Sequence, residues 1–167
     1  MKKNRLLQII VVVMLMAVVS SGVVVRTASA AVEANNRTFN ALVSGTVTVS
    51  MMDETNFELA GTGTASHLGK LRSYMADGEL TKFDAEGVPT EDILVETLTA
   101  ANGDTLIIKC DQILEVVGPG VFRGTDTWTV IGGTGRFSSA TGFGSGVTNV
   151  DLNGGTFTKD LTGSIDY

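Results

Sequence analysis

The chain contains a single cysteine and a single histidine among its 167 residues. Cys110 has no second cysteine to pair with, so the chain cannot form an internal disulfide. His67 alone cannot build a histidine-rich metal site. We therefore predict no metal and no cofactor, and a fold whose stability comes from a packed apolar core, for which the chain is long enough.

Long apolar runs are also scarce, and the clearest one lies at residues 6–19. A basic start (Lys2, Lys3, Arg5) precedes it and the small residues 28–30 follow it, the order typical of a secretory signal peptide. The run is shorter than the ~20 residues that span a bilayer. We predict a signal helix over residues 1–30, cleaved after Ala30, and a secreted mature domain over residues 31–167, in the periplasm or outside the cell. An uncleaved anchor is the alternative. After cleavage, we expect that the mature chain does not insert stably into a membrane.

Basic residues are few in the predicted mature chain. Removal of Lys2, Lys3, Arg5 and Arg26 leaves 8 basic residues against all 18 acidic ones, a net charge of −10. Nucleic-acid binding requires Lys and Arg to displace counterions, so this charge argues against a nucleic-acid partner. It also disfavours an anionic membrane surface, and solubility outside the cell is its simplest meaning.

No helical pattern is visible beyond the signal segment. Residues 31–167 hold 20 threonines and 19 glycines, with short apolar runs between turn residues. This composition predicts an all-β fold, a single small antiparallel β-barrel of about eight strands, which leaves no open sheet edge. The expected strands are residues 38–51, 56–67, 70–77, 92–99, 105–117, 121–131, 139–150 and 156–166, with a polar loop over residues 81–90.

The pair Asn102-Gly103 predicts a tight hairpin, because both residue types accept positive φ. If these two residues form the whole turn, Glu96 lies opposite Lys109, as an opposite-charge pair on the outer face. Val95 and Cys110 then lie opposite each other on the inner face.

Strict alternation assigns side chains to the barrel interior. Asp126 and Trp128 share one face of strand 121–131, and His67 is in phase with the apolar positions of strand 56–67. With Cys110 these residues form the candidate cavity lining. A Cys–His–Asp set could activate a thiolate, but a lone buried cysteine usually packs as a small apolar group and a lone histidine often bonds the backbone. We therefore assign no catalytic residue.

The glycine motifs are expected to be turns. Gly132, Gly133 and Gly135 lack the following helix that would present its N-terminus to a phosphate. Asp151-Leu-Asn-Gly-Gly lacks the later acid of a calcium loop and suits a hairpin turn. Asn102, Gly103, Gly132, Gly133 and Gly135 are thus predicted structural turn residues.

Three segments resemble the barrel family of allene oxide cyclases and plant dirigent proteins. Residues 61–69 resemble a glycine-rich strand of its bacterial members, residues 128–142 resemble its glycine corner, and residues 157–165 its closing strand. The resemblance implies an eight-stranded barrel with an apolar cavity, and often a trimer. No site residue of the family can be matched to a position in this chain, so the cyclase activity does not carry over.

The leading hypothesis is a secreted barrel that binds a small apolar molecule in its interior and is not clearly catalytic. The first alternative is an isomerase or cyclase that uses the same cavity to position a reactive conformer. The second is a structural or surface-interaction protein whose barrel is filled by its own side chains. Cavity volume separates the second alternative from the other two.

Overall fold

The computed structural model describes residues 36–50 and 55–167. The predicted signal helix, its cleavage after Ala30 and the end of the first predicted strand at Met51 lie outside the described residues. Among the described residues, no helix is long and apolar enough to cross a membrane.

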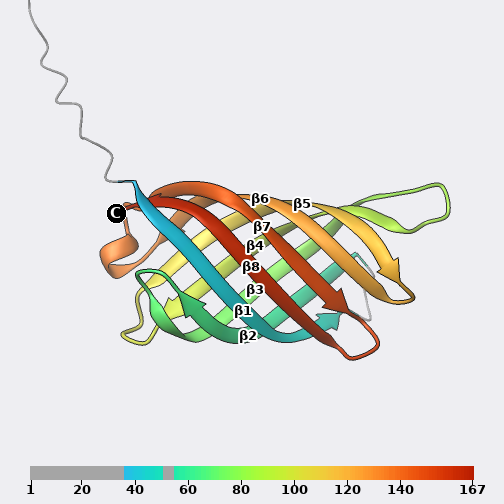
Figure 1. Ribbon diagram of the computed structural model, residues 1–167, viewed down its shortest axis with the longest axis horizontal. Helices are drawn as coiled ribbons and strands as arrows, with labels where there is room; N and C mark the ends of the chain where they lie inside the picture. The colour runs from blue at the N-terminus through green and yellow to red at the C-terminus, as the bar shows by residue number, and fades with distance from the viewer. Residues whose placement is uncertain (1–35, 51–54) are drawn as a thin grey trace, which may run out of the picture. The chain divides into compact units, whose positions relative to one another are not determined.

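The described chain is a closed antiparallel β-barrel of eight strands, which confirms the predicted fold (Figure 1). Each strand pairs with its neighbours in sequence, and β1 closes the barrel by pairing with β8, so that Ala41 lies opposite Leu161. The strands are β1 (Arg37–Val49), β2 (Asn56–Ala65), β3 (Gly69–Phe83), β4 (Pro89–Ala100), β5 (Thr105–Gly118), β6 (Val121–Gly133), β7 (Thr141–Asp151) and β8 (Thr156–Asp166).

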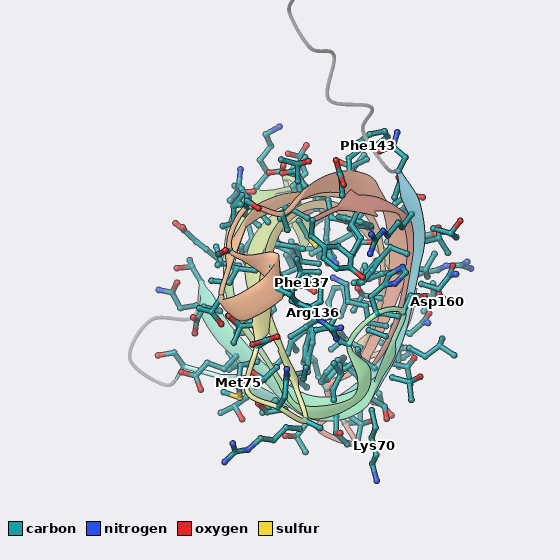
Figure 2. The ribbon with its side chains drawn as sticks, turned by 90° about the vertical axis from the view of Figure 1, so that its left-hand side faces the viewer. Lys70, Met75, Arg136, Phe137, Phe143 and Asp160 are labelled. Carbon is teal, nitrogen blue, oxygen red and sulfur yellow. The ribbon has the colours of Figure 1, made fainter. Side chains whose placement is uncertain are left out.

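Period-two alternation decides which side chains enter the barrel. On β6, Gly124, Asp126 and Trp128 are buried whereas their neighbours are exposed, as predicted for that strand. The interior is packed mainly with apolar side chains, which are buried on every strand except β7, where Val150 is partly buried against the core. In the end-on view of Figure 2, Lys70, Met75, Phe143 and Asp160 point outward from the wall.

The polar loop predicted over residues 81–90 is shorter than expected. β3 continues to Phe83 and β4 starts at Pro89, which leaves residues 84–88 as the connection. Lys82 and Glu91 hold the end of this hairpin with an ion pair of 2.8 Å, and Asp84 Oδ1 accepts hydrogen bonds from the backbone N–H groups of Glu86 and Val88. The end of β3 is exposed and mostly polar, and its sequence was therefore interpreted as part of the loop.

The predicted register of the β4–β5 hairpin is wrong by one residue. Glu96 lies opposite Ile108, and Lys109 lies opposite Val95. The backbone N–H of Gly103 bonds to the carbonyl oxygen of Ala100, and Gly103 has φ +92°. The loop therefore contains three residues, a tight turn followed by a left-handed glycine, and not the two residues of a simple Asn-Gly turn. The odd loop length turns β4 over, so that Glu96 points into the barrel and Val95 points out.

One end of the barrel is closed by the corner between β6 and β7. The 3₁₀ turn η1 (Gly135–Phe137) carries Phe137 over the barrel end, where its side chain is fully buried (Figure 2). The Phe137 ring lies 4.8 Å from the Tyr167 ring, centroid to centroid. Arg136 Nη2 donates a hydrogen bond to the carbonyl oxygen of His67 in the β2–β3 turn, which ties this corner across the same end.

Candidate functional site

An apolar pocket of about 240 Å³ enters the barrel from the end opposite Phe137. This end carries the β3–β4, β5–β6 and β7–β8 connections. Side chains near the mouth, such as Leu114, Phe122 and Val150, are partly exposed. The pocket is lined by Val47, Val49, Phe57, Leu59, Leu80, Pro89, Asp92, Leu94, Gln112, Leu114, Phe122, Gly124, Thr148, Val150 and Leu152.

Three polar side chains form the inner wall of this pocket. Asp92, Gln112 and Thr148 each expose 4% or less of their surface. Gln112 Nε2 donates to Thr148 Oγ1 at 2.8 Å and to Asp126 Oδ2 at 2.8 Å, so both of its N–H groups are used. Asp92 Oδ1 has no hydrogen-bond partner. The pocket thus combines an apolar mouth with an inner carboxyl group that has a buried, unpartnered oxygen.

A buried ion cluster, made of Glu96, Cys110, Asp126 and Lys159, lies directly behind Gln112. Lys159 Nζ lies 2.6 Å from Asp126 Oδ2 and also contacts Glu96 Oε1, and the lysine and both carboxylates have no exposed side-chain surface. Cys110 Sγ donates to Glu96 Oε1 at 3.0 Å. Gln112 connects the cluster to the pocket through its bond to Asp126. The pocket wall is therefore held in place by the charged interior.

Burial and neighbouring charges shift the proton affinities of these groups. Burial would lower the pKa of Lys159, but the negative charges of Glu96 and Asp126 outweigh it and raise that pKa, so the lysine stays an ammonium. Burial and the negative charge of Glu96 raise the pKa of the Cys110 thiol and of the Tyr74 phenol, which keeps both neutral. Burial raises the pKa of Asp92 to about 7, Asp126 and Glu96 add to the rise, and Lys159 only partly offsets it.

The cluster does not need a metal ion. Glu96, Cys110 and Asp126 have potential ligand atoms within 4.8 Å of one another. However, the Lys159 ammonium contacts all three, with Cys110 Sγ at 3.7 Å. Because the lysine already supplies the positive charge among these groups, a metal would have to displace it. The donor set therefore does not fit a metal site.

The four predicted cavity residues do not form one site. Cys110 and Asp126 meet in the ion cluster, but His67 lies in the β2–β3 turn with φ +68°, and its Nε2 is 3.0 Å from the carbonyl oxygen of Thr38. β2 ends at Ala65, before the alternation can carry His67 inward. With the histidine elsewhere and the thiol protonated, the structure offers no Cys–His–Asp nucleophile.

Trp128 and Asp126 both point into the barrel, yet neither lines the pocket. Trp128 Nε1 donates to the carbonyl oxygen of Ser145 at 3.1 Å, and its ring packs edge-on against Phe39. A Cβ on Gly144 or Gly163 would lie within 2.6 Å of the indole, so these glycines make room for it. Trp128 is a core residue.

Of the predicted turn glycines, Gly103 and Gly135 lie in the hairpin and the corner, whereas Gly132 and Gly133 are the last two residues of β6 and pair with β5. Gly135 has φ +58°, and Gly133 ends β6 where a Cβ would meet two backbone oxygens at 2.6 Å. Gly132 has open space beside it. Asn102 bonds to Asp104 within the β4–β5 turn.

The sequence-based reasoning missed the buried charged residues Asp92, Glu96 and Lys159. Lys159 is in phase with Phe157 and Leu161 on β8, so the alternation does place it inside. β4 carries apolar residues on both faces, with Ile93 and Val95 on one and Leu94 and Leu98 on the other. The turn therefore decides which face of β4 points inward. Because the predicted loop was one residue too short, the prediction placed Asp92 and Glu96 on the outer face.

A scan against models of protein families finds no match, and searches of the curated proteins and of the solved structures find none either.

Proposed function

We propose that the protein binds a small apolar molecule in the pocket at the open end of the barrel. The observation that carries this proposal is a 240 Å³ pocket, lined largely by apolar side chains, in a barrel whose other end is plugged by Phe137. An apolar cavity of about 150 Å³ binds benzene in another protein, so this pocket has room for a molecule of one or two rings or a short chain. A few polar groups in an apolar pocket are typical of ligand sites.

The pocket favours binding over a purely structural role. A barrel that served only as a scaffold would fill its interior with its own side chains. Here the filled part comprises the ion cluster, Trp128 and the Phe137 end, and the space remains at the other end.

Two measurements test the binding function. Natively exported protein should release a small apolar compound in mass spectrometry after denaturation, and the ligand-free protein should bind ethylbenzene in a calorimetric titration. Val150→Trp should abolish that binding by filling the pocket, whereas Val95→Trp, on the outer face of β4, should leave it unchanged. Equal ethylbenzene affinity in both folded variants would contradict the proposal.

An isomerase is a second candidate, favoured by the Asp92 carboxyl. A buried acid with a pKa of about 7 in an apolar pocket can both accept and donate a proton near neutral pH. If the protein moves protons next to a carbonyl, it should speed deuterium exchange at the α-carbons of 4-phenyl-2-butanone in D₂O, and Asp92→Asn should remove that rate. Exchange at the same rate in Asp92→Asn would rule Asp92 out as the proton carrier.

Secretion and family membership remain part of the proposal. The basic start, the apolar run and Ala28-Ser29-Ala30 support export of a chain that begins at Ala31. The glycine corner around Gly133 and Gly135 supports the likeness to allene oxide cyclase and dirigent barrels, and with it a trimer.

A further inference from the structure

Asp92 is an acidic group of the inner wall that keeps an oxygen without a partner. It exposes 4% of its surface, lines the pocket and keeps Oδ1 without a hydrogen-bond partner. The two other polar wall residues already bond to each other, and Gln112 also bonds to Asp126. A buried carboxylate oxygen without a partner is costly, so a ligand that supplies a donor there gains that energy.

The charges that act on Asp92 come from β4, β6 and β8. Glu96 lies on β4 with Asp92, Asp126 lies on β6, and Lys159 lies on β8. Tyr74 on β3 and Cys110 on β5 stay neutral. Three buried carboxyl groups therefore share one buried ammonium, which bonds to Glu96 and Asp126. Among the described buried residues no second cation faces Asp92.

We propose that the ligand is an apolar primary amine, whose ammonium enters the pocket first and pairs with Asp92 while its apolar body fills the mouth. This inference rests on the proposed binding function. The amine supplies both missing features, a hydrogen-bond donor for the Asp92 carboxylate and a second positive charge for three carboxyl groups. A carboxylate head of the same size meets unbalanced negative charge and is rejected.

The same pairing predicts how affinity depends on pH. Burial raises the pKa of Asp92 to about 7, so the ionised form that pairs with an ammonium is the minor form at pH 6 and the major form at pH 8. An alkylamine stays protonated over this range, as lysine does. Because apparent affinity scales with the competent fraction, amine binding should be roughly tenfold weaker at pH 6 than at pH 8.

Four probes with one phenylethyl body test the inference by calorimetric titration at pH 8. They are ethylbenzene, 2-phenylethylamine, 2-phenylethanol and 3-phenylpropanoate. The amine should bind at least about tenfold more tightly than the alcohol, as expected for a charge-assisted bond, and the carboxylate should bind most weakly. Asp92→Asn should remove the advantage of the amine over the alcohol and its pH dependence. Asp111→Asn, which removes an exposed acid on β5, is the matched control and should bind all four probes as the wild type does.

Different results overturn the two proposals. If ethylbenzene binds but the alcohol or the carboxylate equals the amine, the amine inference is wrong and the binding function stands. If Asp92→Asn keeps the preference for the amine, Asp92 is not its partner. If none of the probes binds the wild type, the binding function itself fails. Should Asp92→Asn fail to fold, the wild-type pH profile decides, because an amine affinity that is flat from pH 6 to pH 8 contradicts pairing with Asp92.

Discussion

Lys159 illustrates what single residues do in this barrel. Its ammonium is fully buried and contacts Glu96, Asp126 and Cys110. Removing these charges from water costs free energy, and their mutual attraction offsets that cost only while every partner is present. The cluster therefore explains how the pocket wall is held in place, and it is not by itself evidence of a gain in net stability.

Lys159→Met should destabilise the protein by about 3–5 kcal/mol, because it leaves two buried carboxylates without a cation. The measurement is the free energy of unfolding from urea denaturation. Lys82→Met is the matched control, since Lys82 pairs with Glu91 on the surface, and it should cost no more than about 1 kcal/mol. Similar small losses in both variants would show that the buried cluster carries no paired charge.

Asp92 should make stability fall as the pH rises from about 4 to 7. Its folded-state pKa of about 7 lies above the ordinary value of 3.8, so over this range the unfolded chain releases a proton that the folded chain keeps. The difference in unfolding free energy between wild type and Asp92→Asn should therefore decline by on the order of 3 kcal/mol, and level off above pH 7. A difference that stays constant from pH 4 to pH 8 would mean that Asp92 is ionised throughout.

The strands differ in how well their inner faces can be predicted from the sequence. Strands such as β6 and β8 alternate clearly, so their inner faces follow from the sequence, including the charged residues Asp126 and Lys159. On β4 both faces are apolar, and only the conformation of the turn at Gly103 selects the face that carries Asp92 and Glu96. Asn-Gly is compatible with turns of two or three residues, and one residue of difference exchanges the faces.

The corner between β6 and β7 gives a prediction at this scale. Gly135→Ala and Gly133→Ala should each lower the melting temperature. The first puts a Cβ at φ +58° and against Asp104, at a cost of about 1 kcal/mol or more, and the second puts one against two backbone oxygens. Gly132→Ala is the control, since nothing lies within 4 Å of its Cβ. Equal melting temperatures for all three variants would argue against the described corner.

At the scale of the whole molecule, the described barrel is closed at one end by Phe137 and carries the pocket at the other end. Its eight strands follow from spacing and turn residues, because a closed barrel satisfies every strand edge of such a sequence. The pocket does not follow from the sequence in the same way. Its volume depends on how side chains from seven strands fit together, which alternation alone does not specify.

Export is also a property of the whole chain. Protein recovered from the secreted fraction should begin at Ala31, because small residues at positions 28 and 30 suit signal peptidase. Intact-mass measurement and N-terminal sequencing check this. Exported protein that still begins at Met1 or Lys2 would contradict cleavage and favour the anchor.

The most direct test of the central claim is to locate a bound apolar molecule by NMR. Ethylbenzene should be titrated into protein with labelled Ile, Leu and Val methyl groups. The binding function predicts saturable shifts at Val47, Leu114 and Val150 in the pocket, and unchanged methyl signals for Leu71 and Ile165, which lie outside it. Methyl shifts confined to exposed residues such as Leu42 and Ile113, or no saturable shifts at all, would contradict a ligand site inside the barrel.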